Sequence, residues 1–287
     1  KLVNGETVFD MGAVEFGTFV VPLVSAGANM IGGCCGTSPE YIEQIRKNIA
    51  GLTPVPPTVK ALSALTSSRK TVFINSAEKP LIIGERINPA VEKNLQDDLR
   101  EGETYEVQQL AAEQIQKGAD ILNINVGLPG TDETELMRTV VEFIGARFNV
   151  SVCIDSSSPE AIEAALRIYP GRALINSISA EKEKIEKLLP IAAKYGAMFI
   201  LLPLDDKGVP EEADKRCEFI ECVYNEAKKY GYDKDDIIVD GLAAAVSSNQ
   251  KSAAEALKVI KWCKETFGCA SVIGKDKSGN FNYHKIF

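Results

Sequence analysis

The sequence predicts an α/β fold: a (β/α)8 TIM barrel that lacks its last unit, preceded by the C-terminal remnant of a second (β/α)8 barrel. From Pro80 onward, short apolar runs alternate with helical patterns at a spacing typical of right-handed crossovers and a parallel sheet. Acidic and amide residues recur where the predicted strands end. In a barrel all strand C-termini open on one face, so these side chains are expected to converge on one pocket.

Seven strands and six helices follow from the hydrophobic periodicity of this region. The strands are predicted at 81–86, 121–126, 150–155, 173–176, 198–204, 237–240 and 270–273. The helices are predicted at 104–117, 133–146, 159–168, 182–195, 211–230 and 252–267. Only about a dozen polar residues follow, so the eighth strand and helix are expected to be absent, which would expose two sheet edges.

The first part of the chain reads as a separate piece, a remnant at 1–52 joined by a proline-rich linker at 53–60 to a barrel domain at 61–287. Helical periodicity at 15–26 precedes a predicted buried strand at 28–33. A further helix is expected to begin at Ser38 and Pro39 and to end near Ala50. The segment 70–74 resembles one arm of a hairpin that could plug the bottom of the barrel.

Composition excludes several classes of protein. The net charge is −8, with no basic stripe that could neutralise a phosphate backbone, so no nucleic-acid partner is expected. No apolar run approaches the ~20 residues that span a bilayer, so no membrane partner is expected and the cytoplasm is the expected compartment. Seven irregularly spaced cysteines indicate reduced thiols, except for the adjacent pair Cys34 and Cys35. The single histidine, His284, lies in the C-terminal tail, which argues against a Ser-His-Asp or Cys-His nucleophile system.

The polar residues at the strand ends are the candidate site. They are Glu85, Asn88, Asn123, Asn125, Asp155, Asn176, Asp205 and Asp240. Asp155 closes an apolar strand and either caps the next helix or faces a ligand; Ser158, before Pro159, is the better candidate for the cap. Asn176 is either a satisfied structural amide or a ligand contact, and Asp240 repeats the Asp155 pattern.

Carboxylates paired with amides suit a flat heterocycle that carries an amidine edge. A carboxylate accepts two N–H bonds from such an edge, while an asparagine bonds the neighbouring carbonyl or ring nitrogen. This favours a pterin or a purine. No glycine-rich phosphate loop is present, which argues against a nucleotide.

Four motifs carry a resemblance to a known family. They are Leu81-Ile-Ile-Gly-Glu-Arg-Ile-Asn-Pro89, Gly118-Ala-Asp-Ile-Leu-Asn-Ile-Asn-Val-Gly127, Ile154-Asp-Ser156 and Leu174-Ile-Asn-Ser-Ile-Ser179. In order and spacing they resemble the methyltetrahydrofolate-binding, or pterin-binding, barrel of the cobalamin-dependent methionine synthases and their methyltransferase relatives, over roughly 61–274. The segment Ile31-Gly-Gly-Cys-Cys-Gly-Thr37 resembles the last strand of the homocysteine-binding barrel that precedes the folate barrel in that family.

The resemblance implies a methyltransferase of methionine biosynthesis, which moves a methyl group from 5-methyltetrahydrofolate through cobalamin to homocysteine. Cobalamin would be bound by a module outside this chain. The implied pterin-binding residues are Asn88, Asn123, Asn125, Asp155, Asn176 and Asp240, of which Asp155, Asn176 and Asp240 would be catalytic. Asn123 stands where many relatives have Asp, Gly241 replaces a usual Pro, and Gly274-Lys-Asp-Lys277 replaces a Gly-Leu-Ser-Asn segment near pterin N5.

Cys34 and Cys35 are the candidate zinc ligands. Adjacent thiolates after two glycines can both reach one Zn²⁺, and a third ligand would leave one tetrahedral position for the homocysteine sulfur. The resemblance places that third cysteine upstream of Lys1, outside this sequence. The other interpretation is a pair of buried, reduced cysteines.

Three alternatives remain at this point. A stand-alone methyltetrahydrofolate:corrinoid-protein methyltransferase would use the same barrel without a zinc segment. A dihydropteroate synthase would share Asp155, Asn176 and Asp240 but needs a basic anion-binding motif near its last strand. A catalytically impaired pterin-binding fragment would keep the pocket only, and the chain as it stands is expected to be incomplete for activity.

Overall fold

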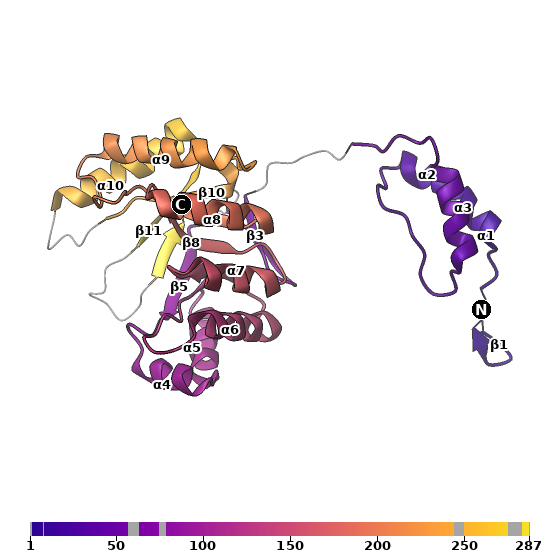
Figure 1. Cartoon of the computed structure of the whole chain (residues 1–287), viewed down its shortest axis with the longest axis horizontal. Helices are drawn as coiled ribbons and strands as arrows, with labels where there is room; N and C mark the ends of the chain where they lie inside the picture. The colour runs from indigo at the N-terminus through magenta and orange to yellow at the C-terminus, as the bar shows by residue number, and fades with distance from the viewer. Residues whose placement is uncertain are drawn as a thin grey trace. The chain divides into compact units, whose positions relative to one another are not determined.

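The computed structural model describes residues 2–7, 9–56, 63–74, 79–243, 250–274 and 283–286. The chain forms two compact units, residues 1–61 and 62–287, and each is described by itself (Figure 1). Across the described ranges, no helix combines the length and the apolar character needed to cross a bilayer.

Unit 1 is a small assembly of three helices and a short hairpin. Strands β1 (Leu2–Val3) and β2 (Glu6–Thr7) pair antiparallel. The helices are α1 (Ala13–Thr18), α2 (Val20–Ser25) and α3 (Pro39–Ile49). The predicted helical regions 15–26 and 38–50 are therefore confirmed, the first as two short helices.

The predicted buried strand at 28–33 is wrong. These residues form no strand, and the Met30 side chain is 94% exposed. A strand needs neighbours that pair with its backbone N–H and C=O groups, and the described part of unit 1 offers no sheet beside this segment. The apolar sequence alone does not create a strand.

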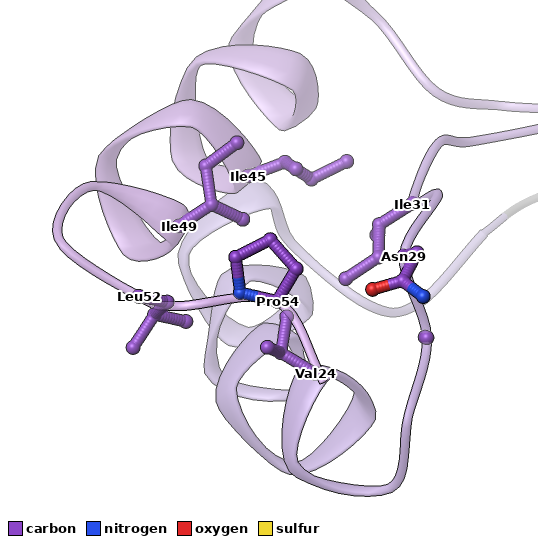
Figure 2. A pocket seen from close by; sticks show the side chains of 8 residues that line it. Val24, Asn29, Ile31, Ile45, Ile49, Leu52 and Pro54 are labelled. Carbon is purple, nitrogen blue, oxygen red and sulfur yellow. The ribbon is translucent and has the colours of Figure 1, made fainter. Parts of the chain in front are cut away.

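Side chains from α2, α3 and the segment after each helix line a pocket of about 200 Å³ in unit 1 (Figure 2). Its walls are mainly Val24, Ile31, Ile45, Ile49 and Pro54, and they offer no titratable group. The polar residue at its edge, Asn29, donates its side-chain N–H to the Val55 carbonyl oxygen at 3.1 Å. The pocket therefore lacks the convergent polar groups that would orient a small ligand.

Unit 2 contains a closed barrel of eight strands. The parallel strands are β5 (Leu81–Ile87), β6 (Ile121–Ile124), β7 (Ser151–Asp155), β8 (Leu174–Ser179), β9 (Met198–Leu202), β10 (Ile237–Asp240) and β11 (Ala270–Gly274). They pair in sequence order, each parallel to the next. The predicted fold class, a TIM barrel that lacks its last βα unit, is confirmed.

The expectation of two exposed sheet edges is wrong. The short strand β12 (Tyr283–Ile286) runs antiparallel between β11 and β5 and pairs with both. An unpaired strand edge leaves a row of backbone hydrogen-bonding groups without partners, and β12 satisfies them on both sides of the gap. Antiparallel pairing needs no crossover connection, whereas a parallel strand in this place would need one.

Helices flank the strands of unit 2 (Figure 1). They are α4 (Lys93–Glu101), α5 (Tyr105–Gln116), α6 (Glu133–Arg147), α7 (Pro159–Ile168), α8 (Lys182–Tyr195), α9 (Ala213–Lys228) and α10 (Gln250–Trp262). A π-helical turn, Cys263–Phe267, ends the last helix. The six predicted helices are confirmed, and α4 was not predicted because its apolar face is only Leu95 and Leu99, both of which are buried.

The core of unit 2 has two layers, because successive side chains of a strand point to opposite faces. The larger cluster lies between the strands and the helices. The smaller cluster comes from alternate positions of the strands, among them Ile83, Cys153 and Ile238, and includes Leu65 and Val72. Alternation assigns these strand residues to the barrel interior.

The hairpin of β3 (Ala64–Thr66) and β4 (Thr71–Phe73) supplies that Leu65 and Val72. The Thr66 N–H bonds the Arg172 carbonyl oxygen at 3.1 Å, and Arg172 precedes strand β8. The hairpin therefore closes the N-terminal end of the barrel, as the pattern at 70–74 predicts.

We expect Leu65→Ala to lower the free energy of unfolding by about 2–5 kcal/mol, because it leaves a cavity at a side chain that is 0% exposed. Urea denaturation followed by circular dichroism measures the change. Phe73→Ala is the matched control on the same hairpin, since that ring is 46% exposed and its loss should cost far less. Equal losses of unfolding free energy from the two substitutions would contradict the packing of the hairpin into the barrel interior.

Candidate functional site

The candidate site lies at the C-terminal end of the barrel interior. Each polar residue stands two positions after an interior apolar residue of its own strand, so alternation points both side chains to the same side. The pairs are Ile83 and Glu85, Ile121 and Asn123, Cys153 and Asp155, Leu174 and Asn176, and Ile238 and Asp240. An apolar interior therefore ends in a polar layer.

Three of these side chains form one hydrogen-bonded chain across neighbouring strands. Asn123 donates its Nδ2 hydrogen to Asp155 Oδ2 at 2.9 Å, and Asn176 donates its Nδ2 hydrogen to Asn123 Oδ1 at 3.2 Å. Asn123 is 0% exposed, whereas Asp155 and Asn176 are half-buried. The buried amide thus connects two side chains that are accessible from the open end of the barrel.

The Asp155 carboxylate is not used to begin the next helix. Ser158 Oγ accepts the Ala161 N–H at 3.2 Å and caps α7, as predicted. The preceding turn is held by Ser156, whose hydroxyl donates to Glu133 Oε1 and accepts the Ser158 N–H at 2.9 Å. The alternative in which Asp155 serves as the helix cap is therefore wrong.

Four of the five remaining predicted residues, all except Glu85, stabilise the turn that follows their own strand. Asn88 Oδ1 accepts the Ala90 N–H at 2.9 Å, and Asn125 Oδ1 accepts the Gly127 N–H at 3.0 Å. Asp240 Oδ1 accepts the Leu242 N–H at 2.7 Å, and Asp205 Oδ1 accepts the Lys207 N–H at 2.9 Å. These are Asx-type turns that fix the rim loops of the barrel.

Negative charge gathers just above the apolar interior. Cys153 is fully buried, and its burial together with the charges of Asp155 and Glu85 raises the pKa of its thiol well above the ordinary value. This thiol stays neutral. The carboxylates of Asp155 and Glu85 therefore lie near the top of the apolar interior.

Carboxylates beside two amides at one end of a barrel can accept N–H groups of a flat heterocycle and bond its neighbouring polar edge atoms. Among the described residues, no three histidine, cysteine, aspartate or glutamate side chains lie close enough together to hold a metal ion. The acceptor oxygens of Asp155 and Glu85 and the amides of Asn123 and Asn176 suit the barrel mouth to an organic ligand with N–H donors.

Cys34 and Cys35 lie in unit 1 and are both exposed, so the interpretation of two buried thiols is wrong. Their Sγ atoms are 3.7 Å apart. Two thiolates bound tetrahedrally at ~2.3 Å to one Zn²⁺ stand about 3.8 Å apart, so the pair fits two of the ligand positions. A third ligand is not found among the described residues.

Two protein families match the sequence. The family described as pterin binding enzyme matches residues 84–278, which include the whole polar layer. The chain belongs to this family. The family described as homocysteine S-methyltransferase matches residues 1–49, which include Cys34 and Cys35.

Similar proteins support the same assignment. The methionine synthase of Mycobacterium tuberculosis is 24% identical over 246 residues, which are 83% of this chain and 21% of that protein. The chain thus spans about a fifth of the length of this curated relative. The resemblance to methionine synthases is confirmed, with the two family matches in the predicted order.

A solved pterin enzyme has the same barrel architecture. The 7,8-dihydropteroate synthase of Vibrio fischeri superposes with a TM-score of 0.52 and 19% identity, over 72% of this chain and 76% of that one. At this identity the likeness supports the fold alone.

Sequence reasoning missed residues that hold the C-terminal end of the barrel in place. The sequence analysis assigned no contact to Glu133, Ser156 or Arg216. Glu133 accepts the Ser156 hydroxyl, and Arg216 is 2% exposed and bonds carbonyl oxygens of two loops. Each depends on a contact between segments distant in sequence, and periodicity carries no signal for such contacts.

We expect iodoacetamide to label Cys34, Cys35 and Cys222 rapidly at pH 8, because all three are exposed. Cys153 and Cys263 should stay unlabelled, because both are buried and the pKa of each thiol is raised. Burial raises the pKa of Cys153, and a hydrogen bond with Cys269 together with burial raises that of Cys263. Peptide mass spectrometry of the native chain measures this, with the chain in guanidinium chloride as control. Native labelling of Cys153 at the rate of Cys222 would contradict the buried interior.

Proposed function

We propose that the barrel binds 5-methyltetrahydrofolate and presents its methyl group for transfer to cobalamin and then to homocysteine, as in methionine synthesis. The observation that carries this proposal is the chain of Asp155, Asn123 and Asn176 at the open end of a pterin-family barrel. The similarity to a methionine synthase and the homocysteine-methyltransferase match in unit 1 support the acceptor.

The proposed roles follow from what each side chain offers. Asp155 would accept N–H groups from the amidine edge of the pterin, and Asn176 would bond the neighbouring edge atoms. Asn123 would fix both, because it is buried and bonded to each of them. Asp240 would supply a second carboxylate, with Asn88 and Asn125 on the rim.

Methyl transfer breaks the N5–CH3 bond and leaves the electron pair on N5, which must then take up a proton. Cobalamin would supply the methyl acceptor, and we propose that a module outside this chain holds it. The residues nearest the family's N5-contacting position, 275–277, lie outside the described residues. Asp155, Asn176 and Asp240 remain the proposed groups that stabilise the protonated pterin.

We also propose that Cys34 and Cys35 hold zinc, which would keep the homocysteine sulfur as a thiolate. The 3.7 Å separation of the two sulfur atoms and their exposure support this. All seven cysteines are free, as reducing conditions favour, and we propose the cytoplasm as the compartment.

A second candidate function is pterin binding without complete catalysis. It is favoured by β12, which closes the barrel antiparallel where a parallel strand with its helix would complete a (β/α)8 unit. Transfer of the methyl group from 5-methyltetrahydrofolate to free cob(I)alamin separates the two candidates. A chain that binds the folate and transfers no methyl group is the binding fragment.

We expect Asp155→Ala to weaken binding of 5-methyltetrahydrofolate about ten- to hundredfold, because it removes a charged acceptor for pterin N–H groups. Isothermal titration calorimetry of the intact chain measures the dissociation constant. Asp97→Asn is the control, since the Asp97 side chain on α4 is 78% exposed and belongs to a surface pair with Arg100. A parent chain that is folded and does not bind would refute the proposed function.

For zinc, we expect the chain to bind the ion through Cys34 and Cys35, and more weakly than a site with its full ligand set. Equilibrium dialysis against Zn²⁺ measures the binding. The double variant Cys34→Ser/Cys35→Ser should lose it, whereas Cys217→Ser/Cys222→Ser should keep it. The same zinc uptake by both double variants would show that these two thiols are not ligands.

A further inference from the structure

We propose that Arg216 is a positioning residue that holds the Asp240 turn in the geometry that binds the pterin. The inference rests on the proposed function and adds to it a residue outside the polar layer. Arg216 lies in α9, and its side chain contacts the loops that follow β9 and β10.

Arg216 is a buried cation that is satisfied by main-chain carbonyl oxygens. Its side chain is 2% exposed, and a charge removed from water in this way is costly unless hydrogen bonds replace the solvent. Nε donates to the Pro210 carbonyl oxygen at 2.8 Å. Nη1 donates to the carbonyl oxygens of Gly241 and Leu242 at 3.0 and 3.1 Å.

These carbonyl groups belong to two different rim loops. Pro210 lies between β9 and α9, whereas Gly241 and Leu242 directly follow Asp240 at the end of β10. One planar guanidinium therefore joins both loops. The rigid fork of donors suits this task better than the single nitrogen of a lysine.

The turn after Asp240 needs such support. Leu242 has a φ of +50°, a left-handed conformation that is unfavourable for a residue with a Cβ atom. Among the described residues, a pocket of about 280 Å³ lies against Leu242. The Asp240 Oδ1 bond to the Leu242 N–H and the two bonds from Arg216 hold the turn.

The same contacts orient the Asp240 carboxylate. One carboxylate oxygen is bonded to the Leu242 N–H, so any movement of Leu242 moves or releases the carboxylate. Arg216 fixes the two carbonyl groups on either side of that N–H. Loss of the guanidinium would therefore cost ligand affinity through the Asp240 turn, because Arg216 bonds main-chain carbonyl oxygens of the rim loops.

The test compares Arg216→Lys and Arg216→Met with the parent chain, using 5-methyltetrahydrofolate in calorimetric titrations. We expect Arg216→Met to weaken binding at least about tenfold after correction for the folded fraction, and Arg216→Lys to weaken it less. A double-mutant cycle with Asp240→Asn should show that the two losses are not additive.

Arg172→Met is the matched control. Arg172 also bonds carbonyl oxygens, those of Gly196 at 2.9 Å and Ala64 at 3.4 Å, and pairs with Asp236, but it lies at the plugged end of the barrel. Its loss should lower the melting temperature and leave the affinity of the folded chain unchanged. A merely structural role for Arg216 would make the two variants behave alike.

A second readout does not need the ligand. Hydrogen exchange of the Leu242 amide, followed by NMR, should accelerate in Arg216→Lys and Arg216→Met and stay unchanged in Arg172→Met. If the parent chain fails to bind the folate, the proposed function fails while this exchange still tests the turn. Unchanged exchange of Leu242, or unchanged affinity in a folded Arg216→Met chain, would overturn the inference.

Discussion

The alternation of side chains along the parallel strands is the constraint on which the rest of unit 2 depends. Interior positions of the strands supply apolar residues to the smaller core cluster, and in β5, β6, β7, β8 and β10 a polar residue follows such a position two residues later. Asn123, Asp155 and Asn176 come from three neighbouring strands and meet for this reason alone. A register slip of one residue would turn all of these side chains outward.

The degree of burial separates the polar side chain that is fixed inside the barrel from those that face its open end. Asn123 is fully buried, so its polar atoms need hydrogen-bond partners. Its side-chain N–H bonds Asp155, and its side-chain oxygen accepts from Asn176. Its neighbours are only half-buried and retain access to the barrel mouth. The buried amide holds the side chains of Asp155 and Asn176 in place, which would reduce the ordering cost of binding the proposed ligand.

The sequence predicted the barrel well because its signals are local. Apolar runs, caps such as Ser158 and the strand-end polar residues all appear within a few residues of one another. The predictions failed where a partner distant in the chain decides the outcome. The segment 28–33 is apolar but has no neighbouring strand to pair with. Strand β12 forms because it pairs with the edges of both β11 and β5. Arg216 is buried because carbonyl oxygens of two loops accept its hydrogen bonds.

The two units differ in the size of their buried cores. In the described part of unit 1 only Gly17, Val20 and Ile45 are buried, whereas unit 2 has a continuous double-layered core. A small core leaves little free energy to set against the conformational entropy of the chain, so the cooperative stability belongs to unit 2. The polar layer lies directly above the core of unit 2, whereas the thiols of Cys34 and Cys35 belong to unit 1, which has the smaller core. The proposed ligand binding at the barrel mouth therefore depends on the core of unit 2, whereas the proposed zinc binding depends on the small core of unit 1.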